Sequence, residues 1–216
     1  MNWNDHSDLK GRHALYSPSS CDYIGHKDDC PEDMYKRRKS FYAAAMGTAL
    51  HEYAEDRIRY KLRLAKSSKN DVLLHLLKSD IPRDVIDIDF IYENYMNYVN
   101  DAIGYRMDPE IALYYSDAFF GHADSICFTN DKGKKVLRIH DYKSGVLPAR
   151  MKQLKQYAAL FFLEYKVNPS DVDIILRLYQ VDNEVEEIAD VNEIREIMDI
   201  IIDKTKMYNE AIGRCT

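Results

Sequence analysis

The alternation of apolar and polar residues divides the chain into a helical part and a mixed part. In the first third, apolar residues recur at helical spacing, and one face of the first predicted helix carries Gly47, Leu50, His51, Ala54, Ile58 and Leu62. Two further helical runs follow, "DVLLHLLKSD" at 71–80 and "RDVIDIDFIYENYMNYVNDAIGYRM" at 83–107. This pattern predicts a mainly helical N-terminal part over residues 1–108.

From residue 109 onwards the pattern favours strands. "EIALYYSDAFFGHADSICF" (110–128) and "KVLRIHDY" (135–142) are rich in β-branched and aromatic residues, and the turn "TNDKGK" separates them. A helix over 149–166, a buried strand over 171–180, a short strand over 183–190 and a helix from Val191 complete the chain. A helix between two strands favours parallel pairing with a right-handed connection. We therefore predict one α/β domain over residues 1–216, with a sheet core and its crossover and C-terminal helices over 109–216.

The second strand of this hairpin ends in charged residues. In "VLRIHDYKSG" the alternation places Asp141 and Lys143 on the apolar face of the strand. If the hairpin is symmetric about Lys132-Gly133, paired residue numbers sum to 265 and Asp124 faces Asp141. Such side chains lie roughly 5 Å apart, so the two carboxylates repel each other unless a cation lies between them. A bulge in the loop would shift this register by one residue.

A hard divalent cation is the simplest occupant of such a site. Lys143 would then orient a water, or help to deprotonate it, and would balance the charge of an arriving phosphate. His51 is either a buried core residue or a further ligand, and Gly47, one turn earlier, would permit close packing of the helix against the sheet. Gln153 and Tyr157 lie on one side of the crossover helix.

Composition narrows the class of protein. The chain has 216 residues, of which 46% are hydrophobic and 31% charged, as is typical of a globular domain. It has no apolar run that could span a bilayer and no apolar signal core, so we expect an intracellular, cytoplasmic protein with no membrane partner. The four cysteines are scattered, which favours free thiols over a zinc or redox site.

The charge is unevenly distributed. The net charge of −6 argues against a general nucleic-acid binder, but residues 36–69 carry ten basic against three acidic side chains. Residues 182–199 carry eight acidic side chains against one basic. These runs are either solvated helical faces or a basic surface for phosphates with the acidic end turned away.

Five short pieces stand in order between residues 17 and 157. They are "SPSSCDYIGHKDDCP", "GTALHEYAE", "FGHADSI", "IHDYKSG" and "QLKQY". Each piece is loose, but the ordered set resembles the PD-(D/E)XK nuclease superfamily in its RecB-like branch, which includes recombination-complex nuclease domains, CRISPR-associated adaptation nucleases and many phage exonucleases. The resemblance implies a restriction-endonuclease-like fold, a central mixed β-sheet flanked by helices.

The resemblance also implies roles for individual residues. His51, Asp124 and Asp141 would be metal ligands with the backbone carbonyl of Tyr142, and Lys143 would be the catalytic lysine beside the two acids. The metal would be Mg²⁺ or, because one ligand is a nitrogen, Mn²⁺.

A second group of residues would hold the DNA. Gln153 and Tyr157 match the family's Q-x-x-x-Y element, which holds the DNA backbone. The remaining DNA path would be lined by the basic run at 36–69 and by Arg150, Lys152 and Lys155.

One departure from the family concerns cysteine. Some relatives hold an iron–sulfur cluster on one early cysteine and three near the C-terminus. Here Cys30 could match the early one, but only Cys215 lies near the end, so we predict no cluster. The Cys-Pro pair is instead interpreted as a helix start, with Pro31 in the first turn.

The implied activity is hydrolysis of DNA phosphodiesters by in-line attack of metal-activated water, in an exonuclease that acts on ends or single strands. A second hypothesis is an inactive nuclease-fold subunit that binds DNA or protein, but the complete acid–acid–lysine set argues against it. The third is an α/β protein whose motifs are coincidental, which needs five coincidences in order. DNA is the expected partner, and a second copy of the chain or a recombination or replication protein is left open.

Overall fold

The structure, a computed structural model, describes residues 1–10, 31–131, 133–145, 151–180 and 183–213. In these ranges the α-helices are α1 (Pro31–Arg59), α2 (Lys69–Lys78), α3 (Ile88–Gly104), α4 (Lys152–Tyr165) and α5 (Val191–Gly213). The strands are β1 (Asp108–Ser116), β2 (Phe119–Asp131), β3 (Lys134–Lys143), β4 (Val172–Gln180) and β5 (Asn183–Ile188). Short 3-10 helices cover Ser7–Leu9, Lys66–Ser68, Arg83–Val85 and Pro169–Asp171.

The helical part follows the predicted pattern with two corrections. α1 ends at Arg59, so Leu62, predicted on its apolar face, lies beyond the helix and is 48% exposed. α1 begins at Pro31, as predicted, since the fixed φ of proline suits the first helical turn. The third helix is shorter than predicted, because Arg83–Val85 form a separate 3-10 turn. α3 begins after Asp87, whose carboxylate accepts a hydrogen bond of 3.1 Å from the Phe90 amide.

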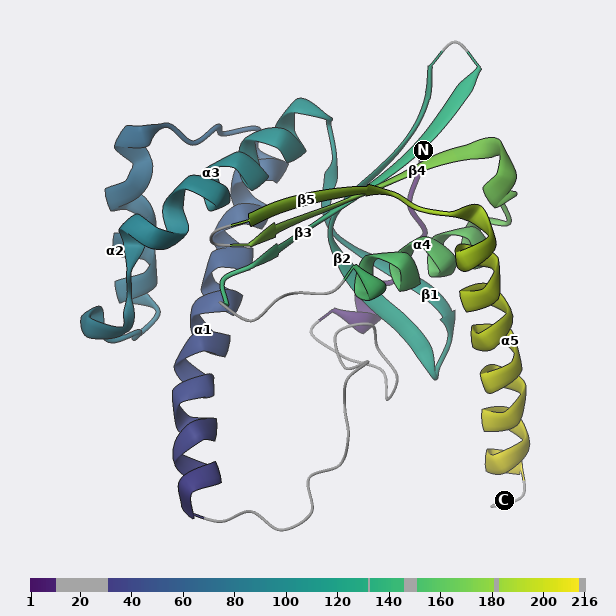
Figure 1. Cartoon of the computed structure of the whole chain (residues 1–216), viewed down its shortest axis with the longest axis horizontal. Helices are drawn as coiled ribbons and strands as arrows, with labels where there is room; N and C mark the ends of the chain where they lie inside the picture. The colour runs from purple at the N-terminus through teal and green to yellow at the C-terminus, as the bar shows by residue number, and fades with distance from the viewer. Residues whose placement is uncertain (11–30, 132, 146–150, 181–182, 214–216) are drawn as a thin grey trace.

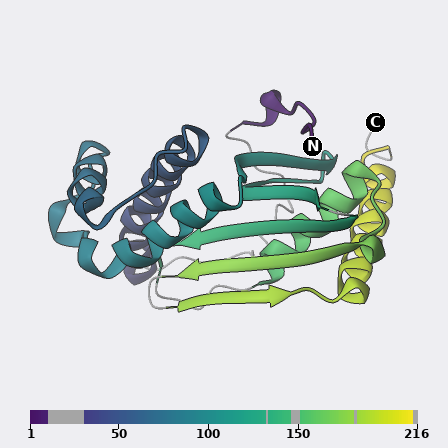
Figure 2. The same cartoon turned by 90° about the horizontal axis from the view of Figure 1, so that it is seen from above.

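The five strands form one mixed sheet in the order β1-β2-β3-β4-β5. β3 and β4 are parallel, as predicted for strands joined through α4, and the other neighbours are antiparallel. The chain is thus an α/β protein with a mixed sheet flanked by helices. Figures 1 and 2 show α1–α3 gathered at the end of the sheet where β3 and β4 finish, and α5 at the opposite end.

Two apolar cores lie on the two faces of the central strands. On one face, α1–α3 pack against Cys127, Tyr142 and Tyr179. On the other, α4 and α5 pack against residues that include Leu137 and Ile174. Within the described ranges, no helix is both long and apolar enough to cross a membrane.

Candidate metal centre

The site lies where the sheet divides. The β2–β3 ladder has the predicted register, from Asp131↔Lys134 to Ser125↔His140. Beyond that pair, β2 is paired only with β1 and β3 only with β4. Asp124, the next residue of β2, reaches across with its side chain instead, and its Oδ2 accepts a hydrogen bond of 3.1 Å from the Tyr142 amide. The two predicted acids, Asp124 and Asp141, lie at this division of the sheet.

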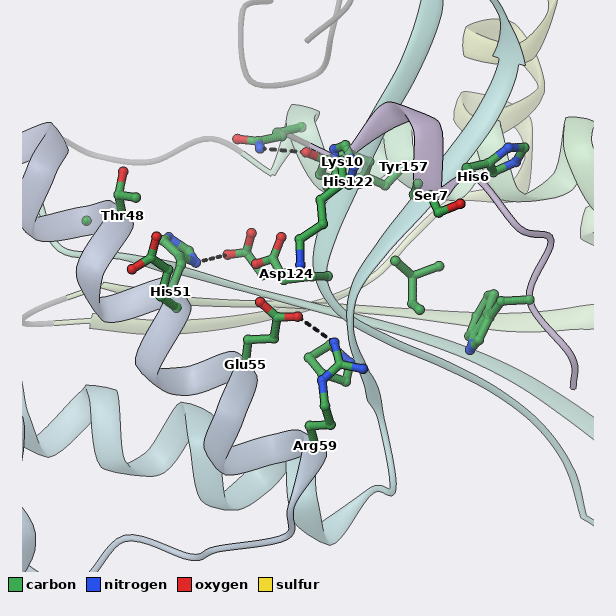
Figure 3. A pocket seen from close by; sticks show the side chains of 18 of the residues that line it. His6, Ser7, Lys10, Thr48, His51, Glu55, Arg59, His122, Asp124 and Tyr157 are labelled. Atoms are coloured by element: carbon green, nitrogen blue, oxygen red, sulfur yellow. Dashed lines mark hydrogen bonds and ion pairs between the residues drawn. The ribbon is translucent and has the colours of Figure 1, made fainter. Parts of the chain in front are cut away.

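His51 of α1 lies beside the same division of the sheet. Its Nδ1 lies 3.3 Å from Asp124 Oδ2, so the structure brings the predicted histidine and aspartate together (Figure 3). His51 is partly exposed and is therefore not the fully buried core histidine of the alternative interpretation. Gly47 packs close to Ser144 at the end of β3, but a Cβ there would lie 3.5 Å from Ser144 Oγ, an ordinary van der Waals contact, so this packing does not require glycine.

Glu110 is a site residue that the sequence reasoning missed. One ligand atom each from His51, Glu110 and Asp124 all lie within 4.8 Å of one another. Glu110 interrupts the β1–β2 ladder between Pro109↔Ser125 and Ile111↔Ala123 without shifting the register, and its φ is +52°. A left-handed backbone is costly for a residue with a Cβ, and such strain is concentrated at functional sites.

Asp141 and Lys143 form a pair beside this triad. Asp141 is 1% exposed, its Oδ1 accepts a hydrogen bond of 2.9 Å from Lys143 Nζ, and its Oδ2 has no partner among the described residues. Asp141 is not part of the triad that could hold a metal. Tyr142, between the two, has its side chain buried in the core formed with α1–α3, where its ring lies edge-on to that of His51 with centroids 6.3 Å apart.

The pKa shifts of the cluster favour an additional cation at this site. Burial, reinforced by the charge of Asp124, raises the pKa of Glu110 to about 8. Burial likewise raises the pKa of Asp141 to about 7, although Lys143 opposes this. Burial alone would lower the pKa of Lys143, but the charges of Asp141 and Asp124 outweigh it and hold that pKa well above its usual range. The raised pKa values show that ionised carboxylates are costly here without a further cation, and one nitrogen with carboxylate oxygens is a donor set that suits Mn²⁺ or Mg²⁺.

The cluster opens into a cavity of about 950 Å³. Its lining includes His51, Glu110, Asp124 and Lys143, together with Gln153 and Tyr157 of α4. Gln153 Nε2 donates a hydrogen bond of 3.2 Å to the Tyr157 hydroxyl, so the predicted glutamine–tyrosine pair faces the same space as the triad. Figure 3 shows α1 on one side of this space and residues of the N-terminus on the other.

Of the other predicted DNA-binding residues that the structure describes, Arg59 of the basic run at 36–69 lines the cavity, whereas the lysines of α4 do not. Lys155 pairs with Glu187 and Glu193, each at 2.7 Å, and these ion pairs join α4 to β5 and α5. Lys152 is exposed, and neither lysine lines the cavity. Arg150 lies outside the described residues, as do Cys30 and most of the first of the five motifs.

Comparison with known proteins adds little. No protein-family model matches the chain, and no curated protein matches it. Among solved structures, one chain described as "Crystal structure of SSO0001" is similar at 14% sequence identity and a TM-score of 0.31, over 73% of this chain and 83% of that chain. A likeness at this TM-score supports no statement about fold family or function.

Proposed function

We propose that this chain is a metal-dependent deoxyribonuclease with a restriction-endonuclease-like fold, similar to the RecB-like branch of the PD-(D/E)XK superfamily, and that it acts as an exonuclease. The observation that carries the proposal is the convergence of His51, Glu110 and Asp124 within 4.8 Å, with Lys143 lining the same cavity. Two acids, an imidazole and a lysine from four different elements meet at one point, which a structural role alone does not require.

In this proposal the triad would hold Mg²⁺ or Mn²⁺, which polarises the phosphate and lowers the pKa of a water. The water oxygen would bond to phosphorus and lose a proton to solvent, while the phosphorus–oxygen bond to one sugar breaks in line and the released sugar oxygen takes up a proton from solvent to become a hydroxyl. In the metal-free protein the charges of Asp141 and Asp124 raise the pKa of Lys143, so Lys143 is an ammonium there and would stabilise charge on the phosphate. Asp141 holds that ammonium in position.

The test is cleavage of linear and circular DNA, single- and double-stranded, with Mg²⁺, Mn²⁺ or EDTA. We expect metal-dependent loss of linear substrates, reduced by about 100-fold or more in Lys143→Ala, Asp124→Asn and Glu110→Gln. Lys206→Ala and Asp199→Asn, exposed changes on α5, serve as matched controls and should cleave normally. Cleavage that persists in EDTA or in Asp124→Asn would contradict the proposal. Binding of DNA without cleavage in any metal would favour the alternative, an inactive nuclease-fold binding subunit.

A further inference from the structure

The first ten residues form a fixed part of the molecule. Trp3 packs edge-on against Phe161 and Tyr165 of α4, with ring centroids 6.3 and 5.9 Å away, and its indole donates a hydrogen bond to Asp108 of β1. Leu9 is 6% exposed and packs with Phe120. We call Trp3–Lys10 the N-terminal segment, which is docked on the sheet and on α4 and does not behave as a frayed terminus.

A buried carboxylate fastens the N-terminal segment. Glu164 of α4 has a side chain that is 5% exposed, and its Oε1 receives Asn4 Nδ2 and His6 Nε2, each at 2.6 Å. Its Oε2 accepts a hydrogen bond of 2.8 Å from the Tyr114 amide of β1. Hydrogen bonds to an ionised acceptor are stronger than neutral ones, so Glu164 ties the segment, α4 and β1 together.

The N-terminal segment lines the same cavity as the proposed metal site. Its residues from Trp3 to Ser7 and Lys10 stand on one side, and α1 stands on the other with His51 and Arg59 (Figure 3). Glu110 and Asp124 line the same cavity. Lys10 is exposed and brings a positive charge to this wall, whereas Arg59 is paired with Glu55, one turn earlier on α1.

We infer that the N-terminal segment is the second wall of the substrate cleft, that Lys10 binds a phosphate next to the scissile one, and that this wall restricts the cleft to a single nucleic-acid strand. The inference rests on the proposed function. A cavity of about 950 Å³ is of the size that single ligands occupy, which fits a few nucleotides of one strand between the two walls better than a duplex. A cation on the wall suits the charge that every nucleotide carries.

The test measures binding in a Lys143→Ala background, where substrate is not consumed, with a fluorescent oligothymidine and a DNA duplex in Mg²⁺ or Mn²⁺. We expect Lys10→Ala to weaken single-strand binding about fivefold and to reduce the slope of log affinity against log salt by about 0.7. Lys206→Ala removes a lysine from α5 and is the matched control, in which neither quantity should change.

A second variant, Trp3→Ala with Glu164→Gln, releases the wall without removing a cavity cation. The affinity for the oligothymidine should fall, and the ratio of this affinity to the affinity for the duplex should decrease. Circular dichroism checks that the fold is kept. If this variant does not fold, Lys10→Ala decides alone. Equal binding by the Lys10→Ala and Lys206→Ala variants overturns the inference and leaves the proposed function standing. Failure of the parent protein to bind any DNA in either metal counts against the proposed function itself.

Discussion

At the scale of single residues, Glu110 has three features that lower the stability of the metal-free protein. Its φ of +52° strains the backbone, its carboxylate is largely buried, and Asp124 adds like charge next to it. None of these features helps the metal-free protein to fold. All three are explained if the carboxylate is held in place to share a cation with His51.

Two substitutions separate the strain from the carboxylate. Glu110→Ala removes the carboxylate and keeps the strain, whereas Glu110→Gly removes both, because glycine adopts a positive φ freely. We expect the glycine variant to be more stable than the alanine variant by about 1 kcal/mol, or about 3 °C in Tm. Under the proposed function Mn²⁺ should raise the Tm of the unmodified protein, and both variants should lose that rise. Thermal unfolding with and without Mn²⁺ measures both effects, and equal Tm values for the two variants would show that the backbone is not strained.

The raised pKa of Glu110 also predicts the pH dependence of the metal-free protein. Its ordinary pKa is 4.5 and its pKa in the folded protein is about 8, so over this interval the folded state holds a proton that the unfolded state has lost. Stability from this group is therefore complete below about pH 4.5 and is lost as the pH rises through 8. Urea unfolding in EDTA between about pH 6.5 and 8.5 should show falling stability. Asp141, whose pKa is raised to about 7, contributes to the lower part of this range, so Glu110→Gln should flatten the upper part, above about pH 7.5.

His140 defines the window for that measurement. Burial, with the charges of Arg177 and Arg138, lowers its pKa to about 3, so its contribution to stability is lost as the pH falls below about 6.5. Above that pH His140 is neutral in both states and does not interfere. A curve that keeps its slope in Glu110→Gln would assign the pH dependence to another group.

At the scale of elements, the packing of α1 against the end of β3 leaves room at Gly47. A methyl group there meets Ser144 Oγ at 3.5 Å, and glycine inside a helix is less stable than alanine by roughly 0.5–1 kcal/mol. We therefore expect Gly47→Ala to raise the free energy of unfolding by about that amount and to leave His51 in place. Gly47→Leu, which extends toward Ser144, should instead destabilise by about 1–3 kcal/mol. Urea denaturation decides, and a destabilised alanine variant would mean that α1 approaches β3 more closely than this.

At the scale of the whole molecule, both cores share the central strands. Tyr142 of β3 belongs to the core with α1–α3, and Leu137 of the same strand belongs to the core with α4 and α5. Neither core can be lost without disrupting β3, so we expect one cooperative unfolding transition. Trp3, the only tryptophan, reports on α4, while circular dichroism reports on all helices. The unfolding transitions followed by Trp3 fluorescence and by circular dichroism should coincide in urea. Separate midpoints would mean that the helices of residues 1–108 and the part at 109–216 unfold independently.

The second hairpin shows how far local sequence information reaches. The register from Asp131↔Lys134 to Ser125↔His140 is constant, so the distance along the chain gives it, and residue numbers alone bring Asp124 and Asp141 to the same level. The periodic placement of apolar residues likewise predicts the helices, the strands and the parallel pairing of β3 with β4, because burial of one face is a property of the local pattern.

Glu110 marks the limit of that information. The same arithmetic on the first hairpin, centred on Asp117-Ala118, gives the sum 235 and places Ile111 opposite Asp124. An irregularity between Tyr114 and Ser116 moves the pairing by one residue and brings Glu110 there instead. The irregularity, the separation of β2 from β3 and the docking of Trp3 all depend on contacts between residues far apart in the chain. The sequence alone determined which residue types could do the chemistry, and only the tertiary packing decided which of them meet.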